Sequence, residues 1–275
     1  MSVADRQADG AKMASTIQNS DPAEAPPFLR IRGLCKQFGS IQALRNVDLD
    51  VRRGEVLGLL GDNGAGKSTL IKSISGVYAP DAGTIECEGK PVVIASPTAA
   101  RSLGIETVFQ DLALIPNLDA ASNLFIGREL GWGPFKGLFL LMRHRAMEED
   151  ARKTLEQLDI HIPSLRAEVD EFSGGQRQAI AVARAIRWKA KMVILDEPTA
   201  ALSVPEQRKV LALTRQLASQ GVAVIFITHN ILDVVAVTDR VAILHRGQKA
   251  AEVLTKDSNE HEIVSLIMGK GKAAA

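Results

Sequence analysis

Hydrophobic and polar positions alternate in the N-terminal third of the chain, and this alternation predicts β-strands. The pattern starts at Phe28–Arg32 and returns at Leu44–Val51, and two short runs follow at Thr84–Glu88 and Pro91–Ile94. A period of two places one face of each strand against a core and the other toward solvent. The four runs together predict a small antiparallel β layer.

A second pattern, of short continuous apolar runs, begins after this first alternation. Runs rich in Val, Ile and Leu are typical of strands that are buried on both faces, and helix-length segments separate most of them. This order predicts an α/β fold with a mostly parallel sheet and crossover helices. The runs are Glu55–Leu60, Ile105–Phe109, Met192–Leu195, Val222–Ile227 and Arg240–Leu244.

Between Leu112 and Trp188 the spacing of apolar residues is mostly helical, most clearly over Ala146–Leu158. The segment Phe135–Met142 is unusually apolar. It is either a helix or loop packed on its own domain or a docking surface for a membrane partner. We expect a helical subdomain over about residues 112–188.

Residues 1–27 are rich in Ala, Ser, Asp, Gln and Pro and have no apolar periodicity, which predicts a disordered N-terminal tail. We expect one domain over residues 28–270 and a short tail over residues 271–275.

Composition narrows the possible functions. The 33 Lys+Arg against 32 Asp+Glu give a net charge of +1, which argues against a dedicated nucleic-acid binder. The two cysteines, Cys35 and Cys87, form neither a metal-ligand spacing nor a disulfide framework. No run reaches the ~18 apolar residues of a membrane span, and the N-terminus has no signal pattern. We therefore expect a soluble intracellular chain that reaches a membrane only through a partner.

A glycine-rich segment after the first buried run fits the phosphate-binding pattern G-x-x-x-x-G-K-[ST]. Glycines let backbone N–H groups converge on phosphate oxygens, and the following helix adds its positive N-terminal end. We expect Lys67 to reach the β- and γ-phosphates of a nucleoside triphosphate and Ser68 to offer its hydroxyl to Mg²⁺. The predicted phosphate-binding residues are Gly61, Asp62, Asn63, Gly64, Ala65, Gly66, Lys67, Ser68 and Thr69.

Two acids follow the apolar run Met192–Leu195 and predict the catalytic edge of the sheet. We expect Asp196 to hold Mg²⁺ through water and Glu197 to polarise the attacking water as a general base. His229 follows Val222–Ile227 and is expected at the same edge, within reach of the γ-phosphate. A lone histidine is often structural, but its position at the end of a core strand favours the functional interpretation.

The segment Glu171–Gln178, with the sequence E-F-S-G-G-Q-R-Q, opens a predicted helix whose N-terminus is a second anion site. With this segment, the motifs over about Phe28–Met268 resemble the ABC ATPase family, in the family's order. The resemblance implies that two subunits bury two ATP molecules head to tail, with the signature of one serving the ATP of the other. The signature residues so implied are Ser173, Gly174, Gly175 and Gln176.

The resemblance assigns further roles. Phe38 matches the aromatic residue that stacks on adenine, and Gln110 matches the residue that touches Mg²⁺ or the attacking water. The segment after Gln110 faces the permease in relatives. Phe172 replaces the usual leucine, an exchange that should be tolerated. Ser203 stands where many relatives carry aspartate, which puts the usual communication between the two sites in doubt.

Residues 61–72, 104–112 and 196–202 look most like ATPases of bacterial simple-sugar importers of the ribose, xylose and fructose type, nearest to the single-domain fructose type. The resemblance implies ATP and Mg²⁺ as cofactors, a homodimer, two transmembrane permease subunits and, indirectly, a periplasmic sugar-binding protein. It places the subunit peripherally at the cytoplasmic face of the inner membrane.

Three alternatives remain open from the sequence. One is an ABC ATPase for another cargo, such as branched-chain amino acids. Another is a non-transport ABC protein of translation or DNA repair, although the second domain, coiled-coil insert or basic extension usual there is not seen. A GTPase switch lacks support because no Asn-Lys-x-Asp motif occurs in the sequence.

Overall fold

The computed structural model describes residues 26–132, 141–200 and 202–269. Nearly all of the predicted N-terminal tail, the predicted C-terminal tail and most of the apolar segment Phe135–Met142 lie outside the described residues. Within the described residues, none of the helices combines the length and the apolar character needed to cross a membrane.

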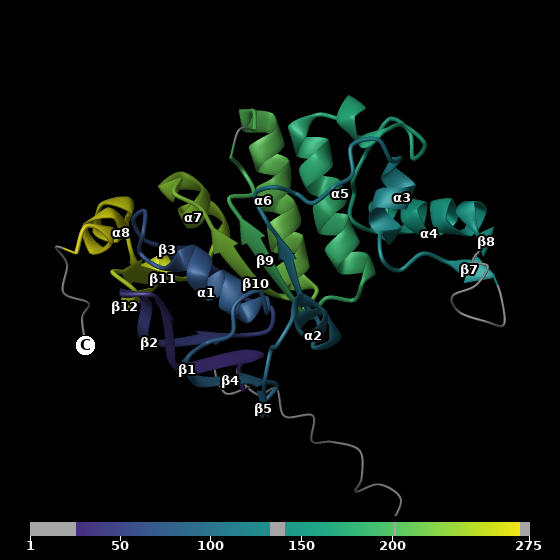
Figure 1. Cartoon of the computed structure of the whole chain (residues 1–275). Coiled ribbons are helices and arrows are strands. Elements are labelled where there is room, and N and C mark those ends of the chain that lie inside the picture. The colour runs from purple at the N-terminus through teal and green to yellow at the C-terminus, as the bar shows by residue number, and fades with distance from the viewer. Residues whose placement is uncertain (1–25, 133–140, 201, 270–275) are drawn as a thin grey trace, which may run out of the picture.

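A six-stranded sheet occupies the centre of the molecule, in the order β12-β11-β3-β10-β9-β6 (Figure 1). Its five consecutive strands from β11 to β6 are parallel, which confirms the predicted parallel sheet, and β12 joins the edge antiparallel to β11. The edge strand was not predicted, because its residues are mostly exposed or half-buried. The strands are β3 (Val56–Leu60), β6 (Ile105–Val108), β9 (Met192–Asp196), β10 (Ala223–Ile227), β11 (Arg240–His245) and β12 (Gln248–Leu254).

A four-stranded antiparallel sheet in the order β2-β1-β4-β5 confirms the predicted β layer. The β1–β2 hairpin is longer than predicted and extends to the pair Phe38 and Ile41. Shifts of register after Ile31 interrupt the alternation, so the second half of β1 has no clear strand pattern. The strands are β1 (Leu29–Phe38), β2 (Ile41–Val51), β4 (Ala82–Cys87) and β5 (Lys90–Val92).

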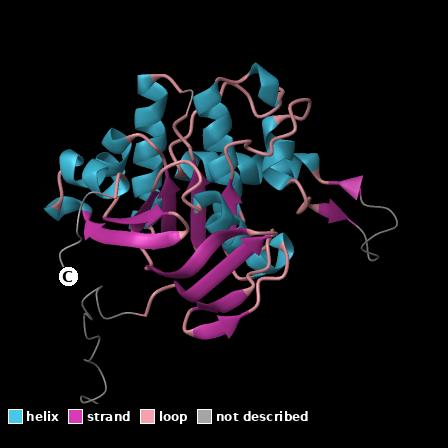
Figure 2. Ribbon diagram, turned by 60° about the vertical axis from the view of Figure 1, so that its left-hand side comes forward, coloured by secondary structure: helices cyan, strands magenta, loops and turns pink. Residues whose placement is uncertain are grey.

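Helices cover the sheets in two layers, as Figures 1 and 2 show. Helix α1 lies between the two sheets, whereas α5, α6 and α7 lie over the other face of the six-stranded sheet. The helices are α1 (Lys67–Ile74), α2 (Pro97–Ser102), α3 (Ala120–Phe125), α4 (His144–Gln157), α5 (Gly174–Arg187), α6 (Val204–Ser219), α7 (Ile231–Val237) and α8 (Glu260–Ile267). Between α3 and α4, two very short strands, β7 (Gly131–Trp132) and β8 (Leu141–Met142), pair with each other.

Alternate residues of the central strands enter two separate cores. In β9, Ile194 packs with α1 and the antiparallel sheet, whereas its neighbours Val193 and Leu195 pack with α5 and α6. All three side chains are fully buried. Because both faces of the strand are covered, its sequence is continuously apolar, which is why the run was recognisable.

A buried ion pair fixes the end of the sheet at which β3 and β11 begin. Glu55, directly before β3, accepts hydrogen bonds from Arg240 of β11 at 2.6 and 3.1 Å. The two residues are only 8% and 6% exposed. Arg240 also donates to the backbone oxygen of Asp50 at 2.7 Å and contacts Glu252, so this guanidinium ties together β2, β3, β11 and β12.

We expect Glu55→Ala to lower the free energy of unfolding by about 3–5 kcal/mol, because it leaves the buried Arg240 charge without its main partner. Urea unfolding followed by circular dichroism measures this loss. Glu149→Ala is the matched control, since Glu149 pairs with Lys153 on the exposed face of α4 and its removal should change the free energy of unfolding far less. Equal losses in the two variants would contradict the role assigned to the buried pair.

Candidate functional site

The phosphate-binding loop begins where β3 ends, and close backbone approaches explain its glycines. Gly61 has a φ of 146°, and a Cβ there would lie 2.2 Å from the backbone oxygen of Leu244. Gly66 caps α1 with a φ of 105°, and its Cβ would lie 2.8 Å from the backbone oxygen of Ala43. The loop is therefore pressed between β2 and β11, and only glycine fits at these two positions.

The Lys67 ammonium folds back over the loop. Its Nζ donates to the backbone oxygens of Gly61 at 2.5 Å and Asp62 at 3.1 Å. Burial lowers the pKa of Lys67 from its ordinary value, and the nearby charges of Glu197, Asp62 and Asp196 oppose this shift. The ammonium thus lies among acidic groups at the mouth of the loop, where a phosphate can replace its present carbonyl partners.

Strand β9 ends in the two predicted acids. Burial, followed by the charge of Glu197, raises the pKa of Asp196, while Lys67 and Lys72 oppose the shift. Asp196 still pairs in register with Ile227 of β10, so its position is fixed by the sheet.

Glu197 departs from the strand. It has a φ of 50°, which is uncommon for a residue with a long side chain, and its N–H donates to the backbone oxygen of Ile227 at 2.9 Å. Its Oε2 is buried and accepts no aligned hydrogen bond among the described residues. Backbone strain and a buried acceptor without a bond are features that cluster at active sites.

His229 lies beside this acid. Its Nδ1 is 2.9 Å from Oε2 of Glu197, and its side chain is 82% exposed. The turn that carries it is fixed on both sides, because the Thr228 hydroxyl accepts from the N–H of Asn230 and Asn230 caps α7. The backbone of His229 is therefore fixed, while its exposed ring is not confined by packing.

One cavity of about 810 Å³ brings most of the predicted residues together. It is lined by residues 62–69 of the loop and by Gln110, Asp196 and Glu197. An adjoining cavity of about 580 Å³ adds His229 beside Lys67, Gln110 and Glu197. Sequence reasoning missed seven further lining residues, which no motif marks: Ile41, Gln42, Ala43, Arg45, Ile227, Arg246 and Gly247.

The side chains that line this cavity suit a magnesium ion. Ser68, Gln110 and Asp196, the three residues predicted to contact the metal, offer a hydroxyl, an amide and a carboxylate oxygen. Hard oxygen ligands of this kind are those that Mg²⁺ takes, usually together with substrate phosphates. The donor set therefore fits the predicted ion.

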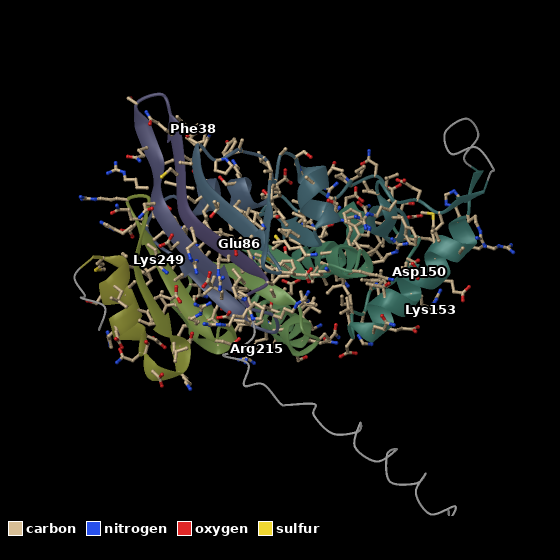
Figure 3. All side chains as sticks on the ribbon, turned by 90° about the horizontal axis from the view of Figure 1, so that it is seen from below. Phe38, Glu86, Asp150, Lys153, Arg215 and Lys249 are labelled. Atoms are coloured by element: carbon tan, nitrogen blue, oxygen red, sulfur yellow. The ribbon has the colours of Figure 1, made fainter. Side chains whose placement is uncertain are left out.

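Phe38 lies near the end of the β1–β2 hairpin (Figure 3). It is 41% exposed and meets the ring of Tyr78 edge-on, with 5.1 Å between ring centroids. The lining of the 810 Å³ cavity includes Ile41, which is opposite Phe38 in the hairpin, but not Phe38 itself. The Lys36 ammonium lies over the Phe38 ring, 5.5 Å from its centroid, and the ring lies next to the cavity rather than inside it.

The signature segment starts α5 with reciprocal capping. The Ser173 Oγ accepts from the N–H of Gln176 at 3.3 Å, and Oε1 of Gln176 accepts from the N–H of Ser173 at 3.0 Å. Phe172, in place of the usual leucine, is buried in the core that contains α5. The phenylalanine ring thus faces the core rather than solvent.

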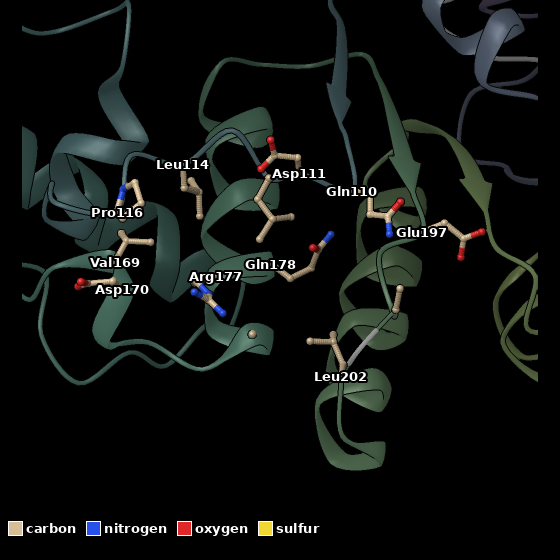
Figure 4. Close-up of a pocket in the computed structure, with 13 residues that line it drawn as sticks. Gln110, Asp111, Leu114, Pro116, Val169, Asp170, Arg177, Gln178, Glu197 and Leu202 are labelled. Carbon is tan, nitrogen blue, oxygen red and sulfur yellow. The ribbon is translucent and has the colours of Figure 1, made fainter.

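The signature and the phosphate-binding loop line different cavities within one chain. Ser173, Gly175 and Gln176 border a groove of about 360 Å³ with α6. Gly174 lines another cavity, of about 400 Å³, together with Gln110 and Glu197 (Figure 4). None of the signature residues lines the 810 Å³ cavity.

Comparison with known proteins gives concordant results. The model of the family described as ABC transporter matches residues 44–200. The chain is 49% identical to the xylose/arabinose import ATP-binding protein XylG of Sulfolobus acidocaldarius over 87% of this chain and 93% of that protein. It is 44% identical to the fructose import ATP-binding protein FrcA of Rhizobium meliloti, over 88% and 94%. A crystal structure of a nucleotide-free ATP-binding cassette from an ABC transporter superposes with a TM-score of 0.75 at 28% identity, covering 88% of this chain and 95% of that one.

We expect Lys67→Ala to weaken the affinity for a nucleoside triphosphate roughly hundredfold or more, because a buried phosphate would lose its charged partner. Titration of a fluorescent nucleotide measures this change. Lys153→Ala is the control, since Lys153 lies on α4 at the far end of the molecule from Phe38 (Figure 3). Unchanged affinity in Lys67→Ala would refute the assignment of the loop.

Proposed function

The chain belongs to the ABC transporter family, and from this premise we propose that it binds and hydrolyses ATP to energise an importer of simple sugars. One observation carries the catalytic part of the proposal. The glycine loop, Lys67, Gln110, Asp196 and Glu197 all line a single cavity. The loop proposed to bind the phosphates and the acid proposed to activate water therefore line the same cavity, as nucleotide hydrolysis requires.

We propose that the loop N–H groups and the N-terminus of α1 hold the phosphates of ATP. Lys67 exchanges its bonds to the backbone oxygens of Gly61 and Asp62 for bonds to the β- and γ-phosphates. Ser68, Gln110 and Asp196 are the residues proposed to hold Mg²⁺, which neutralises phosphate charge when bound. Phe38 is proposed to stack on adenine, a contact typically worth about 1–3 kcal/mol.

Glu197 is proposed to orient a water molecule against the γ-phosphorus and to accept its proton as the bond to ADP breaks. The contact of its Oε2 with Nδ1 of His229, at 2.9 Å, supports a shared task. The exposed ring of His229 is free to turn toward the γ-phosphate once ATP is bound, and it then also limits the positions open to Glu197.

The separation of the two anion sites supports a homodimer. Ser173 and Gly175 lie at the start of α5, and they do not line the 810 Å³ cavity of their own chain. A second copy arranged head to tail brings these groups onto the γ-phosphate of the first. Two ATP molecules then join two subunits, and hydrolysis releases the subunits because the bridging phosphate leaves.

The loop after Gln110 is proposed to transmit the association of the two subunits to the membrane-spanning partners. The Arg184 guanidinium of α5 donates to the backbone oxygens of Leu112 at 3.0 Å and Ala113 at 2.8 Å. The loop and the signature helix are therefore joined by one side chain. We propose that both contact two permease subunits at the cytoplasmic face of the membrane, with a sugar-binding protein on the opposite side.

We expect Glu197→Gln to lower the rate of ATP hydrolysis about 10²–10⁴-fold, since the variant lacks the general base. ATP binding should persist, and the variant should form a stable ATP-dependent dimer detectable by analytical ultracentrifugation. Glu149→Gln on the exposed face of α4 is the control for the loss of one negative charge. A Glu197→Gln variant that hydrolyses ATP at the normal rate would refute the role of this acid.

The nature of the cargo is open to direct measurement. The names of the relatives XylG and FrcA concern xylose, arabinose and fructose, so we expect a monosaccharide to raise ATP hydrolysis severalfold. The assay uses the full chain reconstituted in liposomes with its permease and sugar-binding protein. Stimulation by a branched-chain amino acid and by none of the sugars would overturn the assignment of sugar import.

A further inference from the structure

A carboxylate lies on the N-terminal end of the signature helix. The N–H of Gly175 donates to Oε1 of Glu206 at 3.2 Å. The N–H and the hydroxyl of Ser203 donate to its Oε2 at 3.1 and 2.8 Å. One half-buried side chain thereby joins the first turn of α5 to the first turn of α6.

The contact requires that Gly175 have no side chain. A Cβ on Gly175 would lie 2.8 Å from both Cβ and Cγ of Glu206 and 3.0 Å from its Oε1. A Cβ on Gly174 would likewise lie 2.9 Å from Cδ2 of Leu202. The starts of the two helices are thus too close for an intervening side chain, and Glu206 fills the space beside the N–H of Gly175.

Glu206 is held there as an anion. Hydrogen bonds from the hydroxyls of Ser173 and Ser203, followed by those from the N–H groups of Ser203 and Gly175, lower the pKa of Glu206 to about 2. The positive end of α5 favours the same charge state. An anion bonded to Ser173 and Gly175 is also what the proposed function assigns to the γ-phosphate of the partner's ATP.

We propose that Glu206 is an internal stand-in for the γ-phosphate of the partner's ATP, and therefore a positioning residue that opposes dimer closure. The inference rests on the proposed function, because it takes the signature helix as the phosphate site. The carboxylate and the phosphate need the same donors on Ser173 and Gly175. Glu206 must leave them when the phosphate arrives, and it takes them back once hydrolysis has released the phosphate.

This exchange also links the two ATP sites of the dimer. Ser203 lies at the end of the segment that begins with Glu197, and it is bonded to Glu206 through both its N–H and its hydroxyl. ATP on the partner displaces Glu206 through the signature helix, and Glu206 in turn acts on the segment that carries this chain's own catalytic acid. Ser203, which replaces the aspartate of many relatives, would therefore transmit the movement of Glu206 to the segment that carries Glu197, and so couple the two ATP sites.

Glu206→Gln in the Glu197→Gln background tests the proposal. Glutamine retains the capping of α6 at Ser203, because either residue serves at the third helical position, but it removes the charge. We expect the dissociation constant of the ATP-bound dimer to fall at least about tenfold, and about a hundredfold if both sites contribute equally, because neutral acceptors bind donors more weakly than carboxylates. Sedimentation velocity of the full chain measures this constant.

Two further measurements isolate the effect. The affinity of the monomer for ATP should stay unchanged, since the phosphate-binding loop does not contact Glu206. Glu262→Gln is the matched control, because Glu262 occupies the same position in the first turn of α8, after the N-cap Asn259, and is exposed. We expect this control to leave the dimer constant unchanged.

The outcomes separate the two proposals. A dimer that is unchanged or weakened by Glu206→Gln would overturn the stand-in role while leaving ATP-dependent dimerisation intact. Equal tightening by Glu262→Gln would overturn it as well, since the effect would then follow from net charge. If Glu197→Gln alone stays monomeric with ATP, the dimer of the proposed function is itself refuted, and this inference with it.

Discussion

The site depends on one constraint, which is that the parallel strands of the central sheet all end on the same side. Of the five parallel strands that end here, β3, β6, β9 and β10 lead into the phosphate-binding loop, Gln110, the acids Asp196 and Glu197, and His229, with Asp196 as the last residue of β9. Because hydrogen bonds fix the register of these strands, residues distant in the chain are brought together where the strands end. The buried Glu55–Arg240 pair fixes the other end of the same sheet.

The sequence predicted well those features that depend on local pattern. Buried parallel strands such as β9 are continuously apolar, and the phosphate-binding loop has fixed residue types because its backbone is pressed against Leu244 and Ala43. The fold class followed from the strand and helix pattern, and the family from the signature segment Glu171–Gln178 together with the other motifs. The roles of the individual site residues stay predictions, although the structure brings most of them to one cavity.

Other features could not be predicted, because they arise only from tertiary contact. Arg246 lines the 810 Å³ cavity from the turn between β11 and β12, and nothing in its neighbourhood marks it as a binding residue. Ser203 and Glu206 have the spacing of a capping box and could have been recognised locally. The second partner of Glu206, Gly175, lies 31 residues away, so only the packing of α5 against α6 reveals the contact.

The left-handed backbone of Glu197 has a consequence for adaptation. Glycine or asparagine would adopt a φ of 50° more readily than glutamate, so the chain sacrifices some stability at this position. Sites of this kind commonly place heat resistance and turnover in opposition. Laboratory selection for survival at high temperature alone would therefore tend to recruit substitutions here, and the more heat-resistant variants would lack the carboxylate that is proposed to activate water.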